Sequence, residues 1–284
     1  MTPETAPRIS VVIPVLDGAA VLPGCLDALA GQVDAPPFEV LVVDNGSRDA
    51  TARIATEHRV AARVLTEPVR GPYAARNTGI AAARGDIVAF TDADCVPDPR
   101  WLAEGAAAID GGADLAGGAI VQRLSSRPTV WERYDAAMYL AQDQYVAEQG
   151  FAATANLFVR AAVFERVGGF RPELVASGDQ ELCHRASASG FHLVYAPAAR
   201  IDHHPRRSLG ETWTLHRKLG SGFAELARHG ERGSAWRDPA LRISVHWVAS
   251  RTGAHGAPLR ARHIARVHAV AMAARWVGRL TRRG

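Results

Sequence analysis

The sequence predicts an α/β fold with a mostly parallel central sheet flanked by helices, followed by a helical C-terminal extension. Over the first 95 residues short β-branched runs alternate with helix-like segments, a pattern typical of parallel strands joined by right-handed crossovers. The chain has 284 residues and 48% hydrophobic content, which suits one large domain or two subdomains sharing a core. Residues 235–284 are arginine-rich and apolar by turns, which favours a separate extension.

Four short apolar runs are expected to form the parallel strands, at residues 9–16, 38–44, 62–67 and 86–92. Turn residues close them: Asp17-Gly18 follows the first run and Asn45-Gly46-Ser47 the second. The segments between the runs are expected to be helical, at residues 19–31, 49–57 and 73–84. From about residue 123 the alternation gives way to aromatic, helical segments mixed with further strands.

The net charge and the cysteine content limit which partners and which cellular compartment are expected for the protein. The formal net charge of +4 comes almost entirely from arginine, because Lys218 is the only lysine. A positive net charge this small, with no basic stretch interleaved with aromatic residues, predicts that the protein does not bind nucleic acid. The three cysteines are far apart in the sequence, which favours a reducing compartment over a disulfide framework. With no secretory signal and no long apolar run, the sequence is expected to be cytoplasmic.

Two acids, Asp92 and Asp94, follow the fourth predicted strand in the stretch VAFTDADCVPDP. Ligands in open α/β sheets bind outside the carboxyl ends of the strands, and carboxylate oxygens suit magnesium or manganese. A simple acidic turn is the alternative, but the position favours a metal. Asp44 ends the second strand and is either a turn acid or an acceptor for a base N–H or a ribose hydroxyl. No P-loop and no G-x-G-x-x-G after the first strand occur.

Further polar residues each allow two interpretations. Asp179 lies in the first turn of a predicted helix, where it is either a helix-starting acid or a functional carboxylate. Glu181 and Arg185 have the i,i+4 spacing of a helix ion pair, for which a structural role is expected. Arg76, in GPYAARNTGI, is either solvated or faces a nucleotide. The pair His203-His204 is either a metal or phosphate contact or a surface feature.

Five segments carry a family resemblance: IPVLDGAAVLPGCLDAL, VVDNGSRDAT, GPYAARNTGIAAARGDIVAFTDADCVPDP, VGGF and GDQELCHR. In this order they resemble family 2 glycosyltransferases of the GT-A fold, over roughly residues 8–210. The resemblance implies an inverting, metal-dependent transfer of a sugar from a nucleoside diphosphate donor, most commonly a UDP-sugar. The acceptor would be a hydroxyl of a glycan, a lipid-linked molecule or a small molecule.

The resemblance also implies roles for single residues. The base and ribose would lie against Pro14, Val15, Leu16 and Asp44, with Arg76 nearby. Asp92 would also face the nucleotide. Asp92 and Asp94 match the family's D-x-D, which holds Mn²⁺ or Mg²⁺ on the diphosphate, and one of His203 and His204 would join them. Asn156, Gly169 and Phe170 would shape the acceptor side. Asp179 matches the general base, although Gly178 stands where family members often have a glutamate.

The predicted organisation has three parts. Residues 1–122 form a donor-binding half, residues 123–230 an acceptor-binding half with the base, and residues 231–284 a helical extension. In this extension an apolar helical arc either packs on the core or acts as a peripheral anchor at the inner face of a membrane. The arc consists of Ile264, Val267, Val270, Ala271, Ala274 and Val277.

Two other functions fit parts of the sequence. A phosphotransferase could use DADCV as an Asp-nucleophile loop, but such a loop normally follows the first strand and here it follows the fourth. A non-catalytic nucleotide-sugar or glycan-binding protein would keep the fold without needing a base, and the presence of Asp179 argues against it.

Overall fold

The computed structural model of the protein describes residues 6–228 and 261–281. These residues divide between two compact units that interleave along the chain. Among the described residues, the first unit takes in 6–121, 142–173 and 179–203, and the second takes in 122–141, 174–178, 204–228 and 261–281. The donor half, acceptor half and extension expected from the sequence stay a prediction, and residues 231–260 and 282–284 lie outside the described part.

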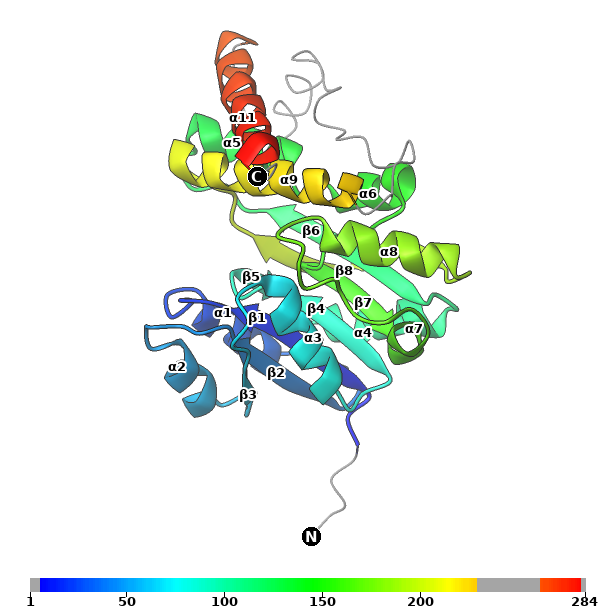
Figure 1. Ribbon diagram of the computed structural model, residues 1–284. Helices are drawn as coiled ribbons and strands as arrows, with labels where there is room; N and C mark the ends of the chain where they lie inside the picture. The colour runs from blue at the N-terminus through cyan, green and yellow to red at the C-terminus, as the bar shows by residue number, and fades with distance from the viewer. Residues whose placement is uncertain (1–5, 229–260, 282–284) are drawn as a thin grey trace. The chain divides into compact units, whose positions relative to one another are not determined.

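An eight-stranded sheet forms the centre of the first unit, in the order β3-β2-β1-β4-β7-β6-β8-β5 (Figure 1). Its first four strands in the chain are β1 (Ile9–Val15), β2 (Phe38–Asp44), β3 (Arg63–Thr66) and β4 (Ile87–Thr91). The pairs β1–β2, β1–β4 and β2–β3 are parallel, as the sequence predicts. Their carboxyl ends therefore share one edge, where the register sets Asp44 beside Val15.

The rest of the sheet adds antiparallel pairs, so the sheet as a whole is mixed. These strands are β5 (Cys95–Pro97), β6 (Leu115–Gln122), β7 (Asn156–Arg160) and β8 (Leu193–His203). β7 runs antiparallel to both β4 and β6, and β5 runs antiparallel to β8. The pairing of β5 with β8 matters for the site, because it aligns Cys95 with His203.

The helices predicted for the first 95 residues are present with slightly shorter bounds: α1 (Leu22–Ala30), α2 (Thr51–Glu57) and α3 (Pro72–Ala82). α3 packs closely on the sheet, because a Cβ on Gly79 would lie 2.4 Å from Val12 Cγ1. This close approach brings the start of α3 to the carboxyl edge of the strands. The remaining helices of the unit are α4 (Trp101–Asp110), α6 (Gln142–Gln149), α7 (Ala161–Val167) and α8 (Gly178–Ala188).

The second unit contains α5 (Val130–Met138), α9 (Leu209–Arg228) and α11 (Ala261–Thr281). Tyr134, Val267 and Ala271 are buried together between α5 and α11. Ala274 is also fully buried, so three of the six residues of the predicted apolar arc, Val267, Ala271 and Ala274, pack within the second unit. The side chain of Ile264 lies outside the described part, and Val277 is 37% exposed. None of the described helices is long and apolar enough to span a bilayer.

Candidate active site

The loops after β1 and β2 are tied together at the carboxyl edge of the sheet. Asp17 donates its backbone N–H to Ser47 Oγ at 2.8 Å, and Arg48 donates its own to Asp17 Oδ1 at 2.7 Å. Gly18 donates to Thr51 Oγ1 at 2.8 Å. The turn residues that the sequence analysis noted here therefore hold two strand ends in a fixed relation.

Asp44 lies in this edge with 9% of its surface exposed and accepts the Ser47 N–H at 3.1 Å. Pro14 is half-buried and Val15 buried, whereas Leu16 is 46% exposed. These four residues, expected to receive a base and ribose, therefore adjoin one another at the ends of β1 and β2.

Asn45 has a role that the sequence analysis missed. Its amide nitrogen donates to the carbonyls of Glu67 and Val69 at 2.8 Å each, and its oxygen accepts the Gly71 N–H at 2.8 Å. Asn45 thus shapes the segment from β3 to α3. Asp-Asn-Gly is also an ordinary turn sequence, so no signal distinguished this role from a turn.

Arg76 and Asp92 meet at the same edge. Arg76 Nη2 lies 2.6 Å from Asp92 Oδ1, and the guanidinium lies over the ring of Tyr73 at 5.6 Å. Arg76 is only 4% exposed, and its Nε has no hydrogen-bond partner in the structure. Burial raises the pKa of Asp92 above its usual range, with Arg76 opposing that rise and Asp94 adding to it.

Asp94 faces His203 because β5 pairs with β8. His203 Nε2 lies 4.0 Å from Asp94 Oδ2, and His203 is buried while Asp94 is exposed. His204, the other histidine expected at a metal, is exposed, and its Nδ1 lies 3.2 Å from the carbonyl of Arg123. His203 is the last residue of β8 and lies near Asp94, whereas His204 follows the strand and lies near Arg123, so His203 is the histidine that fits beside Asp94.

The residues at this edge suit a divalent cation that is only partly held by protein. In the described ranges no group of three or more His, Cys, Asp or Glu residues is placed so that it could hold a metal ion by itself. Asp92, Asp94 and His203 offer oxygen and nitrogen ligands at an open edge. Magnesium-like ions are commonly bound by one or two carboxylates and completed by substrate phosphates and water, so the donor set fits.

Asp179 occupies the first turn of α8, as the sequence predicts. Its Oδ1 accepts the Gln180 N–H at 3.0 Å. Burial raises the pKa of Asp179, against the lowering effect of that hydrogen bond and of the positive charge on Arg76. Arg76 is therefore close enough to act electrostatically on both Asp92 and Asp179, which lie 87 residues apart in the sequence.

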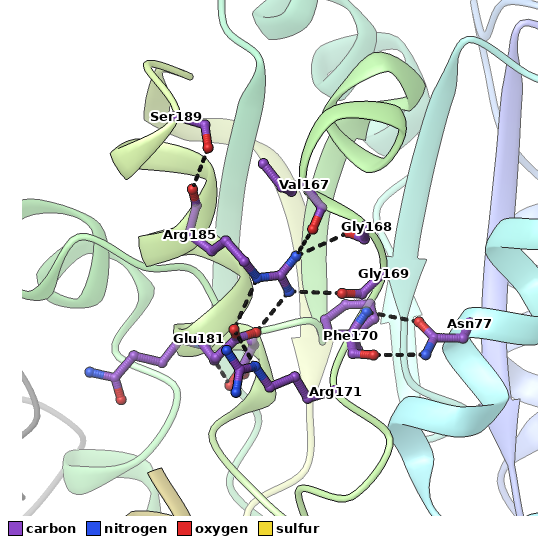
Figure 2. A network of polar contacts seen from close by, with 11 residues as sticks. Asn77, Val167, Gly168, Gly169, Phe170, Arg171, Glu181, Arg185 and Ser189 are labelled. Atoms are coloured by element: carbon purple, nitrogen blue, oxygen red, sulfur yellow. Dashed lines mark hydrogen bonds and ion pairs between the residues drawn. The ribbon is translucent and has the colours of Figure 1, made fainter. Parts of the chain in front are cut away.

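The three residues expected on the acceptor side differ in how far they can reach a ligand. Asn156 is fully buried; its Oδ1 accepts from Trp101 Nε1 at 2.8 Å, and its Nδ2 donates to the carbonyls of Ala119 and Ala199 at 2.9 Å each. It can shape a site only from within the sheet. Gly169 and Phe170 lie in the loop after α7, where Asn77 binds both backbone groups of Phe170 (Figure 2).

Comparison with known proteins finds one matching family for the chain. The family described as Glycosyl transferase family 2 matches residues 10–168, more than half of the chain. Glycosyltransferase AglE of Haloferax volcanii is 38% identical over 229 residues, which cover 78% of this chain and 75% of that protein.

Solved structures are similar in fold. The mannosyltransferase PcManGT of Pyrobaculum calidifontis, in complex with GDP-Man and Mn²⁺, has a TM-score of 0.66 at 21% identity, covering 98% of this chain and 88% of that one. TarS 1–349 of S. aureus in complex with UDP has a TM-score of 0.56 at 19% identity, covering 97% of this chain and 91% of that one.

Proposed function

Because the chain belongs to glycosyl transferase family 2 and is a glycosyltransferase that uses nucleotide-sugar donors, we propose that it transfers the sugar to an acceptor hydroxyl with inversion and with the help of a divalent cation. The observation that carries this proposal is the position of Arg76. Its guanidinium binds Asp92 at 2.6 Å and also acts on the charge of Asp179. This position supports a site that contains both a donor-side acid and a candidate base.

Each residue has a distinct part in the proposed reaction. Asp44, with Pro14, Val15 and Leu16, holds the base and ribose. Arg76 orients Asp92, and its unused Nε can donate a hydrogen bond to the donor. Asp179 accepts the proton of the acceptor hydroxyl while the hydroxyl oxygen bonds to the anomeric carbon. The bond from that carbon to the diphosphate oxygen breaks, and its electron pair leaves with the nucleoside diphosphate.

Asp92, Asp94 and His203 are the residues that would hold the cation. When bound there, Mn²⁺ or Mg²⁺ stabilises the charge that develops on the leaving diphosphate, without a proton being needed. His203 is buried, so it keeps its imidazole fixed beside Asp94. Gly178 stands where family members often have a glutamate, and Glu181, the other acid of that turn, is buried against Arg171 and Arg185, which supports a role for Asp179 as the base.

UDP is the first candidate for the donor nucleotide and GDP the second. Support for both comes from proteins of the same fold, one in complex with UDP and one with GDP-Man and Mn²⁺. The acceptor is a hydroxyl of a glycan, a lipid-linked molecule or a small molecule. Family membership disfavours the phosphotransferase, and in the protein the D-x-D follows the fourth strand, β4.

The proposal is tested by thermal unfolding with UDP, GDP and dTDP, each with and without MnCl₂, followed by nucleoside diphosphate release from the matching nucleotide sugars. A nucleotide at 100 times its dissociation constant is expected to stabilise the protein by about 2.7 kcal/mol, and only with the metal present. Binding without any release of diphosphate would indicate a non-catalytic nucleotide-sugar-binding protein. Equal stabilisation with and without Mn²⁺ would contradict metal dependence.

A further inference from the structure

Contacts made by the residues of α8 after Asp179 help to hold the start of this helix in place. Residues 174–178 belong to the second unit, and the chain returns to the first unit at Asp179. Ser177, two residues earlier, has a φ of 63°, in the left-handed region that non-glycine residues seldom adopt. Asp179 therefore follows directly on a change of unit, and contacts from α8 help to hold it in the first unit, beside its backbone hydrogen bond with Thr154.

Glu181, half a turn after Asp179, provides such contacts. Its side chain is 1% exposed, yet it accepts three hydrogen bonds from two arginines. Arg171 Nε lies 2.8 Å from Oε1, Arg185 Nε lies 2.9 Å from the same oxygen, and Arg185 Nη2 lies 2.8 Å from Oε2. The sequence predicts the Glu181–Arg185 pair, and the structure confirms it. Because Arg171 binds the same carboxylate, Glu181 belongs to a three-residue network rather than to an isolated helix ion pair.

Arg185 connects this carboxylate to the end of α7 (Figure 2). Its Nη2 donates to the carbonyl of Gly169 at 2.8 Å, and its Nη1 donates to the carbonyls of Gly168, at 3.3 Å, and Val167. Carbonyls at a helix C-terminus lack partners within the helix, and a guanidinium satisfies several at once. One arginine thus joins α8 to the loop that follows α7.

Asn77 holds the same loop from the other side. Its Oδ1 accepts the Phe170 N–H and its Nδ2 donates to the Phe170 carbonyl, both at 2.8 Å. A Cβ on Gly169 would lie 2.4 Å from Asn77 Oδ1, so the contact requires glycine at position 169. Figure 2 shows Asn77 and Arg185 reaching the loop from opposite sides. The loop is therefore fixed between α3 and α8.

Phe170 completes the connection to the reacting groups. Its ring stacks on Tyr73, with centroids 5.5 Å apart, and meets Phe90 edge-on, also at 5.5 Å. Tyr73 lies under Arg76, and Phe90 precedes Asp92 by two residues in the chain. A continuous set of contacts thus leads from Glu181 on α8, through the loop, to Arg76 and Asp92.

We propose that Glu181, together with Arg185, is a positioning pair for the transfer reaction: it fixes the start of α8 on the loop at residues 168–170 and so keeps Asp179 in place. The inference rests on the proposed function, because the positioned group is the proposed base. Neither residue touches the reacting atoms. A displacement of about 1 Å in a catalytic group is enough to cost on the order of 100-fold in rate, so loosening of α8 is expected to appear in turnover.

The test compares Glu181→Gln and Arg185→Lys with a matched pair on the surface. Arg185→Lys keeps the charge beside the buried carboxylate but loses the planar fork that reaches three carbonyls. It is therefore the variant expected to stay folded if Glu181→Gln does not. The controls are Glu57→Gln and Arg53→Lys, because Arg53 and Glu57 form an i,i+4 pair on α2 whose side chains are 66% and 62% exposed.

Three measurements are made on each folded variant: hydrogen exchange of the amides at residues 168–171 and 179–183, affinity for UDP and GDP with MnCl₂, and kcat for diphosphate release from UDP-glucose, UDP-N-acetylglucosamine and GDP-mannose. In both site variants we expect faster exchange at these segments, a kcat lower by about 10- to 100-fold and nucleotide affinity within about twofold of the parent. The surface controls should match the parent in all three measurements.

The two proposals fail in different ways. A parent protein that releases no diphosphate from any of the three sugars contradicts the proposed function, while hydrogen exchange still reports on the anchor. Unchanged exchange at residues 179–183 in both site variants contradicts the anchor itself. Faster exchange with unchanged kcat contradicts the positioning role. A fall in nucleotide affinity equal to the fall in kcat would mean that the pair supports the unit as a whole rather than Asp179.

Discussion

Asp179 has two possible roles that make opposite predictions, because it starts a helix and also lies near Arg76. If it is the base, Asp179→Asn removes the proton acceptor and keeps the shape. Turnover should then fall by about two to four powers of ten, the usual share of general-base catalysis. Nucleotide affinity, measured by titration calorimetry with MnCl₂, should stay the same. A helix-starting acid would instead contribute only about 0.3–1 kcal/mol of stability.

Asp143 offers a matched control, because it is an exposed acid in the first turn of α6 in the same unit. Asp143→Asn should leave turnover unchanged. Near-normal turnover in a folded Asp179→Asn protein would show that the base is a different residue.

Asp94 faces His203 across 4.0 Å and is proposed to bind the cation. Asp94→Asn keeps the size of the side chain but weakens it as a ligand for a hard cation. The affinity for UDP or GDP in the presence of Mn²⁺ should fall by at least about tenfold, equivalent to ~1.4 kcal/mol. Calorimetric titration with and without the metal measures this change.

Asp98→Asn is the control for Asp94, since Asp98 is the third acid of the same stretch and binds the Arg100 N–H at 3.2 Å instead of facing His203. It should leave the metal-dependent affinity unchanged. If both variants bound metal and nucleotide like the parent, the cation would have to be held elsewhere or not used.

The helices α9 and α11 cross where glycine lets their backbones approach. A Cβ on Gly278 would lie 2.0 Å from the carbonyl oxygen of Arg217, and one on Gly220 would lie 2.1 Å from that of Arg275. Because backbone atoms cannot move aside as a flexible side chain can, Gly278→Ala should destabilise the protein by about 1–3 kcal/mol. Urea unfolding measures the change.

Gly210→Ala tests whether that loss comes from the crossing. Gly210 lies on α9 with nothing within 4 Å of an added Cβ, so the substitution should be neutral or slightly stabilising, as alanine favours a helix. A similar loss of stability in Gly210→Ala and Gly278→Ala would contradict the close crossing.

His216 makes the second unit sensitive to acid. It is 5% exposed on α9, and Arg275 Nε donates to its Nδ1 at 3.0 Å. Burial, with the positive charges of Arg275, Arg206 and His268, lowers the pKa of His216 to about 3. In the unfolded chain the same group titrates near 6.5.

Since the unfolded chain takes up a proton between pH 6.5 and 3 and the folded protein does not, the stabilisation is complete above pH 6.5 and is lost as the pH falls through this range. At pH 4.5 the loss should reach roughly 2–3 kcal/mol. Urea unfolding from pH 7 to 4.5 measures it. His216→Gln should flatten that dependence, and an unchanged slope in this variant would contradict the assignment to His216.

The parallel strands and their helices could be predicted because each β-branched run is closed by turn residues. The antiparallel strands were harder to recognise. β6 contains Gly117 and Gly118, and β8 contains Pro197, so neither has the continuous apolar pattern of a buried strand. Their presence depends on pairing with β7 and β5, which is a property of the tertiary structure rather than of the local sequence.

The candidate site could be predicted residue by residue from motifs at the strand ends, but its contacts could not. The Arg76–Asp92 ion pair depends on how closely Gly79 lets α3 approach β1. The binding of Asn77 to Phe170 joins positions 93 residues apart. The sequence around Asn45 is that of an ordinary turn residue, and nothing in the sequence indicated the contact that Arg171 makes.

The last described helix, α11, has an exposed surface that is both basic and apolar. Trp276 and Leu280, one turn apart on α11, are 54% and 56% exposed, while the other side of the helix is packed. Arg279 follows on the same helix, and Arg217 and Lys218 are exposed on α9. Apolar groups flanked by cations are typical of peripheral contact with anionic lipid.

We therefore expect sedimentation with vesicles containing phosphatidylserine, weaker binding at high salt and none with neutral vesicles. The double substitution Trp276→Gln, Leu280→Gln should abolish it. Equal sedimentation of parent and double variant would contradict a membrane role for this helix.

The order of the strands in the sheet has a consequence for biosynthesis. β4 (Ile87–Thr91) is entirely buried and pairs on one side with β7, which the ribosome makes about 65 residues later. At roughly 5–20 residues per second, translation leaves that apolar edge without its neighbour for several seconds. An unpaired edge strand is a template for association with other chains. The nascent protein should therefore depend on a chaperone during this interval, and slower translation between codons 92 and 156 should lower the yield of soluble protein.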